Sequence, residues 1–287
     1  MSRPLRLEYA GALYHAFNRG NARQTVFHEP VDFESFLDLL GETCLRFDWH
    51  CHAHCLMPNH YHLLIETRSP TLSIGMRHLN GVFTQRHNRR RKRVGHVFQG
   101  RFKALLVQDE RYLLELARYI VLNPVRATLV ERPAEWPWSS HAWLSGRAGA
   151  PTWAAPNAIW SRLSEAPAGA VRAMDRYLGE AHESPAVGWS ADGVLGDDQF
   201  KRGQTALVEA RRNAVEVPLA MRVVDRPPLV QLIAGGWTRG SSALDARLHL
   251  AVSRWRYSQT EVARQLGVSR TTIAKAVARH RKLQKAT

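Results

Sequence analysis

Two apolar runs joined by a tight turn constrain the fold more than any other feature of this 287-residue chain. Trp49 to Met57 and His60 to Glu66 both have the composition of strands, and Pro58-Asn59 between them is typical of a turn. Strands joined by so short a connection pair in antiparallel fashion. The sequence therefore predicts a hairpin, and with it a mainly antiparallel sheet.

Segments of strand and helix character alternate around this hairpin within the first 145 residues. Before it, we predict a strand over Leu13 to Asn18 and a helix from Pro30, where apolar side chains recur at three- and four-residue steps. After it come a helix over 72–87, a strand over 101–108 and a helix over 109–122. This is an α+β order of elements. Residues 1–145 are thus predicted to form one domain.

The composition of the chain changes after residue 145. Residues 146–240 are rich in Ala, Gly and Pro, with helical patterns near 171–178 and 200–212, and predict a partly helical linker. Residues 241–287 predict a small all-α domain, in which Ser258 and Glu261 form a capping box that opens a helix over 259–266. Gly267 then allows a left-handed turn, and Ser269 caps a helix over 270–282. This is the pattern of a helix-turn-helix.

The charge of the chain indicates a polyanionic partner. Lys and Arg number 40 against 25 for Asp and Glu, a formal net charge of +15. Residues 1–150 carry 20 basic and 13 acidic side chains, residues 151–240 carry 10 of each, and residues 241–287 carry 10 and 2. Two separate basic modules favour a nucleic acid partner over the alternative of a soluble protein that is merely basic.

The cellular compartment follows from cysteine usage and from the apolar runs. Three cysteines, an odd number, cannot form a disulfide framework and favour a reducing compartment. No apolar run approaches the ~18 residues of a membrane span, and residues 1–20 lack the apolar stretch of a signal peptide. We therefore expect a cytoplasmic, nucleoid-associated protein with no membrane partner.

The second strand of the hairpin carries a candidate metal site. His60 and His62 are two residues apart, so on a strand both side chains point to one face and can converge on one cation. From spacing alone, two ordinary strand histidines remain an alternative. A zinc site built from Cys51, Cys55 and either His52 or His54 is a weaker alternative, because the two cysteines are expected on one strand face and these histidines on the other.

A candidate nucleophile lies on the helix predicted over 109–122. Tyr119 and Asn123 are four residues apart, so a phenol and an amide can share one surface of the helix, which Pro124 then ends. Tyr112 lies on a similar face and is a rival to Tyr119. Packing roles for both tyrosines are the alternative.

Four motifs together give the first 145 residues a resemblance to a known family, the REP-associated tyrosine transposases of the HUH superfamily. They occur in order and with matching spacing, and are Met57-Pro58-Asn59-His60-Tyr61-His62-Leu63-Leu64, Gln99-Gly100-Arg101-Phe102-Lys103, Tyr119-Ile120-Val121-Leu122-Asn123-Pro124-Val125-Arg126-Ala127 and Trp136-Pro137-Trp138-Ser139-Ser140. The resemblance implies a ferredoxin-like antiparallel sheet with helices on one face. It also implies an enzyme that cuts and rejoins single-stranded DNA, with hairpin-forming repeats as substrate and a possible homodimer.

The resemblance also implies roles for individual residues. His60 and His62 match the metal ligands, Asn123 matches the position of a third ligand, and Tyr119 matches the nucleophile that forms a 5′-phosphotyrosine. Mg²⁺ or Mn²⁺ is the implied cation, acting as a Lewis acid on the phosphodiester. Tyr61 departs from the more usual aliphatic residue between the two histidines. The runner-up function is a DNA-binding regulator on the same fold that does not cleave.

Basic residues outside these positions are predicted to contact DNA. Arg101 and Lys103 alternate on a predicted strand and can hold phosphates near the metal, although a solvated strand face is an equal alternative. A basic run, expected to be a loop, can hold the DNA backbone without sequence preference, and four residues of the second terminal helix would face a DNA groove. These two sets are Arg89, Arg90, Arg91, Lys92 and Arg93, and Arg270, Thr271, Thr272 and Lys275.

Overall fold

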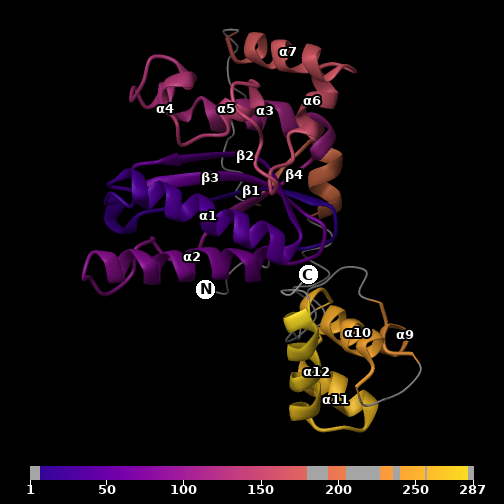
Figure 1. Ribbon diagram of the computed structural model, residues 1–287. Coiled ribbons are helices and arrows are strands. Elements are labelled where there is room, and N and C mark those ends of the chain that lie inside the picture. The colour runs from indigo at the N-terminus through magenta and orange to yellow at the C-terminus, as the bar shows by residue number, and fades with distance from the viewer. Residues whose placement is uncertain (1–6, 180–192, 205–226, 235–239, 256, 284–287) are drawn as a thin grey trace. The chain divides into compact units, whose positions relative to one another are not determined.

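A computed structural model of the protein describes residues 7–179, 193–204, 227–234, 240–255 and 257–283 (Figure 1). The chain divides into two compact units. One comprises Gly11–Arg68 and Leu72–Ala206, and the other comprises Met1–Ala10, Ser69–Thr71 and Leu207–Thr287. Among the described residues, no helix is both long and apolar enough to cross a membrane.

A five-stranded sheet in the order β2-β3-β1-β4-β5 forms the centre of the first unit. Its strands are β1 (Ala12–Arg19), β2 (Trp49–Met57), β3 (His60–Thr67), β4 (Lys103–Val107) and β5 (Val194–Leu195). The predicted hairpin is confirmed, because β2 and β3 pair antiparallel with Met57 opposite His60. β1 pairs antiparallel with both β3 and β4, which gives the ferredoxin-like order, whereas β5 joins β4 in parallel.

Helices cover both faces of this sheet (Figure 1). The crossover helices α1 (Pro30–Phe47) and α2 (Leu72–Arg90) lie on one face, where Phe36 of α1 and Asn80 of α2 both contact Tyr61. Helix α3 (Asp109–Val121) lies on the other face, as Figure 1 shows. The expectation of helices on one face holds for the two crossover helices and is wrong for α3. Seven consecutive residues of β1 are buried, so both faces of the sheet need a cover.

Part of the predicted linker packs onto α3. Ile159, Met174 and Leu195 belong to the same hydrophobic cluster as Leu116 and Ile120 of α3. They come from α6 (Asn157–Leu163), α7 (Pro167–Gly179) and β5. The boundary predicted at residue 145 therefore does not match the edge of this unit. The large apolar residues of this segment are few and lie far apart among Ala, Gly and Pro. The segment therefore has little hydrophobic periodicity from which to predict this packing. Residues 205–212 of the second predicted helical island lie outside the described residues.

Short segments after α3 close the outer edge of β2. They are α4 (Asn123–Arg126), the 3₁₀ turn Pro133–Glu135 and α5 (His141–Leu144). A separate 3₁₀ turn, Asn21–Arg23, follows β1. The amide of Leu56 donates to the carbonyl of Trp138 at 2.9 Å, and the amide of Ser140 donates to the carbonyl of His54 at 2.9 Å. The indole of Trp136 donates to the carbonyl of Leu56. The Trp-Pro-Trp-Ser-Ser motif thus covers the free hydrogen-bonding groups of an edge strand.

The described helices of the second unit are α9 (Leu229–Leu232), α10 (Ser242–Ser253), α11 (Gln259–Leu266) and α12 (Arg270–Leu283). The predicted capping box is present, because Ser258 accepts from the amide of Glu261 and Glu261 accepts from the amide of Ser258. Gly267 takes the predicted left-handed conformation, with φ of 65°. A small core that includes Leu248, Val262 and Ile273 joins the helices. Asp245 of α10 also pairs with Arg279 of α12 at 2.8 Å.

Candidate active site

One face of the sheet brings together polar residues from three neighbouring strands. Phe17 of β1 lies opposite His62 of β3 on one side and Lys103 of β4 on the other. Cross-strand partners point to the same face, and so do residues two apart on a strand. His15 and His60 therefore share this face with His62 and Lys103. It is the same face that α3 covers, because Tyr119 of α3 contacts His62.

The two histidines predicted as metal ligands lie side by side on β3. The ring centroids of His60 and His62 are 5.2 Å apart, with the planes nearly perpendicular. Nδ1 of His60 lies 2.6 Å from Oδ1 of Asn59, an oxygen that can only accept, so this nitrogen carries the proton and Nε2 keeps its lone pair. Nδ1 of His62 lies 2.9 Å from Nε2 of His15. Each candidate ligand is thus held at Nδ1 by a neighbour.

Burial keeps these imidazoles neutral. It lowers the pKa of His60 to about 4, with a further contribution from the charge of Arg19. Burial also lowers the pKa of His62 well below its usual value, helped by His15, His60 and Arg19. The pKa of His15 falls to about 4 through burial alone. A neutral imidazole is the form that binds a metal ion, so the protonation state of this cluster suits cation binding.

Tyr119 reaches the histidines from α3. Its ring stands edge-on to His62, with centroids 5.9 Å apart, and edge-on to His15 at 6.0 Å. The guanidinium of Arg126 lies over the same phenol ring, 4.9 Å from its centroid. Tyr112, the rival, lies two turns earlier on α3. Both tyrosines pack against the hydrophobic cluster, so the ring contacts with His62 and His15 are what mark out Tyr119. The geometry therefore favours Tyr119 as the phenol that serves this cluster.

Asn123 is the first residue of α4 and lies four residues beyond Tyr119. Its side-chain nitrogen donates to the carbonyl of Tyr119 at 2.8 Å and to that of Ile120 at 3.4 Å. Both contacts use the amide nitrogen, which leaves Oδ1 as the atom able to bind a cation. Across the described part of the chain, no three His, Cys, Asp or Glu side chains form a group suited to a metal ion. A cation beside His60 and His62 would therefore need oxygen ligands of another kind, such as an amide or the substrate, which suits Mg²⁺ or Mn²⁺.

The structure does not have the arrangement of cysteines that the weaker zinc alternative requires. A bulge between Cys51 and Ala53 shifts the register of β2, so that Cys51 pairs with Ile65 and Cys55 pairs with His62. Residues 65 and 62 point to opposite faces of β3, and so therefore do the two cysteines. The expectation that they share a face is wrong because period-two alternation fails at a bulge. Burial also raises the pKa of both thiols.

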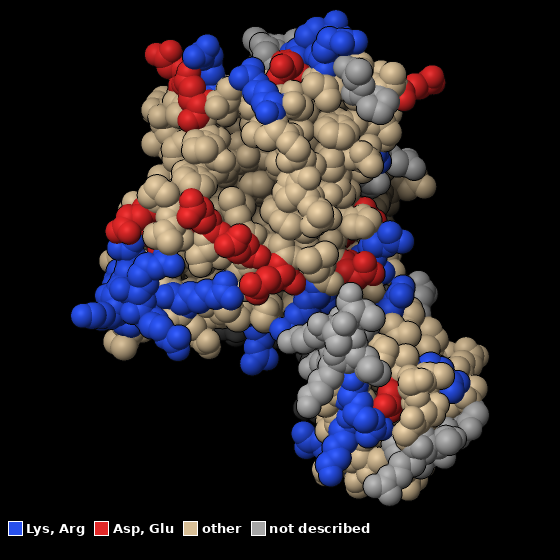
Figure 2. All heavy atoms as spheres, viewed as in Figure 1, with Lys and Arg blue, Asp and Glu red and all other residues tan. Residues whose placement is uncertain are grey.

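Some residues of the basic run at the end of α2 take part in the fold itself. Arg89 and Arg90 lie in the last turn of α2 rather than in a loop. Arg90 and Arg91 both pair with the buried carboxylate of Asp32, at 2.8 Å and 2.6 Å. Among the described residues, no salt bridge engages Arg89, Lys92 or Arg93. Figure 2 shows Lys and Arg side chains gathered over one end of α2. Three of the five residues predicted to bind DNA here therefore keep their charge for a partner.

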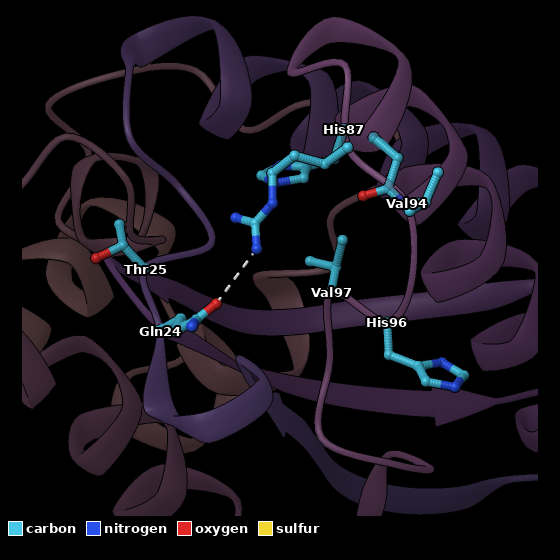
Figure 3. Close-up of a pocket in the computed structure, with 8 residues that line it drawn as sticks. Gln24, Thr25, His87, Val94, His96 and Val97 are labelled. Atoms are coloured by element: carbon cyan, nitrogen blue, oxygen red, sulfur yellow. Dashed lines mark hydrogen bonds between the residues drawn. The ribbon is translucent and has the colours of Figure 1, made fainter.

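A small polar pocket lies beside this run (Figure 3). Its lining residues are Gln24, Thr25, His87, Asn88, Arg93, Val94, His96 and Val97. Arg93 donates to Oε1 of Gln24 at 3.4 Å, the bond that is dashed in Figure 3. The carbonyl of Val97 accepts from the amide of Asn21, and the amide of Gly20 donates to the carbonyl of Asn59. The pocket wall is thus tied to the strand ends next to His60.

Most of the remaining residues predicted to bind DNA are exposed, and one is bonded at the start of its own helix. Lys103 is exposed and opens β4 in the same cross-strand row as His62, whereas Arg101 precedes the strand. In the second unit, three of the four predicted residues on α12 are exposed: Arg270, Thr271 and Lys275. Thr272 is half-buried, and both its amide and its hydroxyl bond to Oγ of Ser269. Ser269 therefore caps α12 through Thr272, and these bonds reduce the availability of Thr272 to DNA.

His15 and Arg126 are the site residues that sequence reasoning missed. His15 alternates with Phe17 on a strand that was predicted, but nothing in the sequence says which strand lies beside His62. Arg126 belongs to the motif around Tyr119, where only its spacing of seven residues, about two helical turns, hints at a shared face.

Two sequence comparisons relate this chain to transposases. Residues 9–123 match the family described as "Transposase IS200 like". A protein of Haemophilus influenzae named as a REP-associated tyrosine transposase is 30% identical over 116 residues, which are 37% of this chain and 66% of that relative. A solved structure of a REP-associated tyrosine transposase bound to a REP hairpin aligns with a TM-score of 0.46 and 18% identity, over 53% of this chain and 89% of the other. The match thus spans less than two thirds of the Haemophilus relative.

Proposed function

We propose that this chain, whose residues 9–123 belong to the IS200-like transposase family, is a tyrosine transposase that cuts and rejoins single-stranded DNA. The observation that carries the proposal is the position of Tyr119 beside His62, with His60 next to His62 on the same strand. A phenol next to two neutral imidazoles is the arrangement that a metal-assisted tyrosine nucleophile needs.

His60, His62 and Oδ1 of Asn123 are the groups proposed to hold Mg²⁺ or Mn²⁺. When bound, the cation would supply Lewis-acid chemistry by screening the phosphate charge and polarising phosphorus. The protein's own part is to keep both rings neutral and to fix His60 through Asn59. Arg126 over the phenol ring holds Tyr119 in place and presents a positive charge to the oxygen as it becomes anionic.

The reaction proposed is a displacement at phosphorus. Oη of Tyr119 forms a bond to phosphorus while the bond to the 3′ oxygen breaks, which leaves a 5′-phosphotyrosine and a free 3′-hydroxyl. A second 3′-hydroxyl then displaces the tyrosine and restores a phosphodiester. The bond energy is conserved in the covalent intermediate, so the strand is rejoined without an outside energy source.

Single-stranded DNA that folds into hairpins is the substrate we propose. The name of the Haemophilus relative associates that protein with REP sequences, so hairpin-forming repeats are the first substrate to test. Lys103 lies in the cross-strand row of His62 and Phe17, and we expect it to contact the phosphate next to the scissile bond. The exposed basic residues of α12 form a second DNA contact in the other unit.

A covalent-adduct assay tests this function. The protein is incubated with labelled hairpin oligonucleotides and Mn²⁺, and the adduct is resolved under denaturing conditions. We expect an adduct with the wild-type protein and with Tyr112→Phe, and none with Tyr119→Phe, which should still bind the DNA. An adduct that survives Tyr119→Phe and disappears with Tyr112→Phe would reverse the assignment. DNA binding without any adduct would favour the non-cleaving regulator.

A further inference from the structure

His15 and His62 form a buried pair of imidazoles on neighbouring strands. His15 is only 3% exposed and His62 only 7% exposed. Nε2 of His15 lies 2.9 Å from Nδ1 of His62, and the rings stack with centroids 5.1 Å apart and planes 27° apart. Both rings contact Tyr119 edge-on. One member of this pair, His62, is also a proposed cation ligand, and His15 is its direct neighbour.

A hydrogen bond between two neutral imidazoles has two forms. If Nδ1–H of His62 donates to Nε2 of His15, then Nε2 of His62 keeps a lone pair and can bind a cation. If His15 donates instead, then Nε2 of His62 carries the proton and cannot. Which nitrogen of a metal-binding histidine is protonated is set by the bond that the other nitrogen makes. His15 is thus placed to decide whether His62 is a ligand.

We propose that His15 is a positioning residue that accepts the Nδ1–H of His62 and so fixes His62 in the form that binds the catalytic cation. This inference rests on the proposed function, because it requires a cation at His62. The same division of roles is present at His60, where the side-chain oxygen of Asn59 accepts from Nδ1. Each ligand then has its own acceptor, one an amide oxygen and the other an imidazole nitrogen.

The opposite nitrogen of His15 supports a dedicated role over simple packing. Nδ1 of His15 is buried and lacks a hydrogen-bond partner in the described structure. When Nε2 accepts, Nδ1 must carry the ring proton, so a buried donor is left unsatisfied. A phenylalanine would fill this space, stack on Phe17 and His62, and avoid that cost. The one advantage of histidine over phenylalanine at this position is the acceptor atom Nε2, which phenylalanine lacks.

Substitutions at position 15 separate the acceptor from the packing. His15→Phe keeps a ring and removes the acceptor, whereas in His15→Gln the amide oxygen takes the place of Nε2. The matched control is His54→Phe, because His54 is also buried with an unpartnered Nδ1, but it packs against Trp143 and Trp153. Mn²⁺ affinity of the full chain is measured by titration, with the free ion followed by electron paramagnetic resonance.

We expect His15→Phe to weaken Mn²⁺ binding by about 10- to 100-fold. His15→Gln should restore affinity to within a few-fold of wild type, and His54→Phe should leave it unchanged. Unchanged Mn²⁺ affinity in His15→Phe, together with its loss in His62→Ala, would overturn the role of His15 and leave the proposed function intact. A wild-type affinity no higher than that of a His60→Ala, His62→Ala double variant would overturn both.

A measurement on the wild-type protein covers the case in which the variants fail to fold. Nitrogen NMR of the side chains with saturating Mg²⁺ identifies the protonated nitrogen of each ring. We expect His62 to carry its proton on Nδ1 and His15 to carry its proton on Nδ1. A proton on Nε2 of His62 would contradict the proposal.

Discussion

The ring of Tyr119 stands edge-on to the ring of His62 in the same chain, with centroids 5.9 Å apart and planes at 86°. Helix α3, which carries Tyr119, packs directly over the sheet that carries His62, through Leu116, Ile120 and Leu64. One chain therefore brings together both halves of the proposed catalytic centre. A helix exchanged between two copies is not needed to assemble it.

The first prediction is that catalytic halves on separate chains do not complement each other. An equimolar mixture of Tyr119→Phe and His62→Ala should form no more adduct than either variant alone, because each chain lacks one half of its own site. Adduct formation by the mixture, measured with labelled hairpin DNA, would indicate that Tyr119 serves the partner of a homodimer.

The second prediction concerns the buried carboxylate that organises the start of α1 and the end of α2. Asp32 accepts from the amides of His28 and Glu29 and from both Arg90 and Arg91. Burial acts to raise its pKa, but these hydrogen bonds and the charge of Arg91 lower the pKa overall. Asp32→Asn should therefore destabilise the fold by about 3 to 5 kcal/mol, because it leaves two cations without their partner.

Urea unfolding of Asp32→Asn measures this loss. Glu29→Gln is the matched control, because Glu29 is exposed and lies 3.6 Å from Arg91; surface pairs of this kind contribute about 1 kcal/mol or less. Equal losses in the free energy of unfolding for the two substitutions would show that the buried position of Asp32 adds nothing to stability.

The third prediction is a loss of stability in mild acid. Burial lowers the pKa of His54 from 6.5 to about 4. Between these values the unfolded chain binds a proton at this residue and the folded chain does not, so the free energy of unfolding falls as the pH drops from about 6.5 to about 4. The loss is roughly 3 kcal/mol for this ring.

His54→Phe should remove the contribution of His54 to this acid sensitivity. The ring packs against Trp143 and Trp153, so phenylalanine keeps the packing. Unfolding by urea at pH 7 and at pH 4.5 gives the measurement, with the exposed His96 replaced by Phe as control. A pH dependence as steep as that of the wild-type protein would mean that His54 is protonated in the folded state.

The fourth prediction separates two kinds of basic residue in this run: those that are free to bind DNA and those that are paired with Asp32. Lys92→Gln and Arg93→Gln should each weaken binding to single-stranded DNA at any sequence. Each should also flatten the slope of log affinity against log salt by about 0.7 for every phosphate that the variant no longer neutralises. Arg90→Gln should instead act mainly on stability, because Arg90 pairs with Asp32. DNA affinities measured across a salt series, beside melting temperatures, distinguish the two. A salt slope that changes for Arg90→Gln alone would refute the division.

The fifth prediction concerns the helix-turn-helix. Arg270→Gln and Lys275→Gln remove exposed charges from α12 and should weaken DNA binding by the full chain, without reducing adduct formation at saturating hairpin DNA. Asp245→Asn, which breaks the pair with Arg279, should lower the melting temperature instead. A loss of adduct in the two charge variants would show that α12 contributes to the chemistry.

Local pattern predicts much of this fold. The hairpin, α1 and the capping box of α11 each depend on residues that are neighbours in the chain, and all are found at the predicted positions. The bulge at Cys51 was not predictable from the alternation of side chains. One extra residue moves the side chains on the N-terminal side of the bulge to the opposite face of the sheet.

Long-range pairing accounts for the other differences between sequence and structure. Arg90 and Asp32 are 58 residues apart, and no local signal tells which cation of a basic run will meet a buried carboxylate. His15 lies 47 residues from His62, and only strand order makes them neighbours. The roles of Tyr119, His60, His62 and Asn123 in catalysis remain predictions.

The covered edges of the sheet have a consequence for self-association. The Trp138 to Ser140 segment already occupies backbone groups on the outer side of β2, and the opposite edge ends in β5, which is only two residues long. A second copy cannot readily add a strand at either edge, so the sheet is protected from the strand-by-strand growth that leads to aggregation. Copies of this chain would therefore not join their sheets edge to edge.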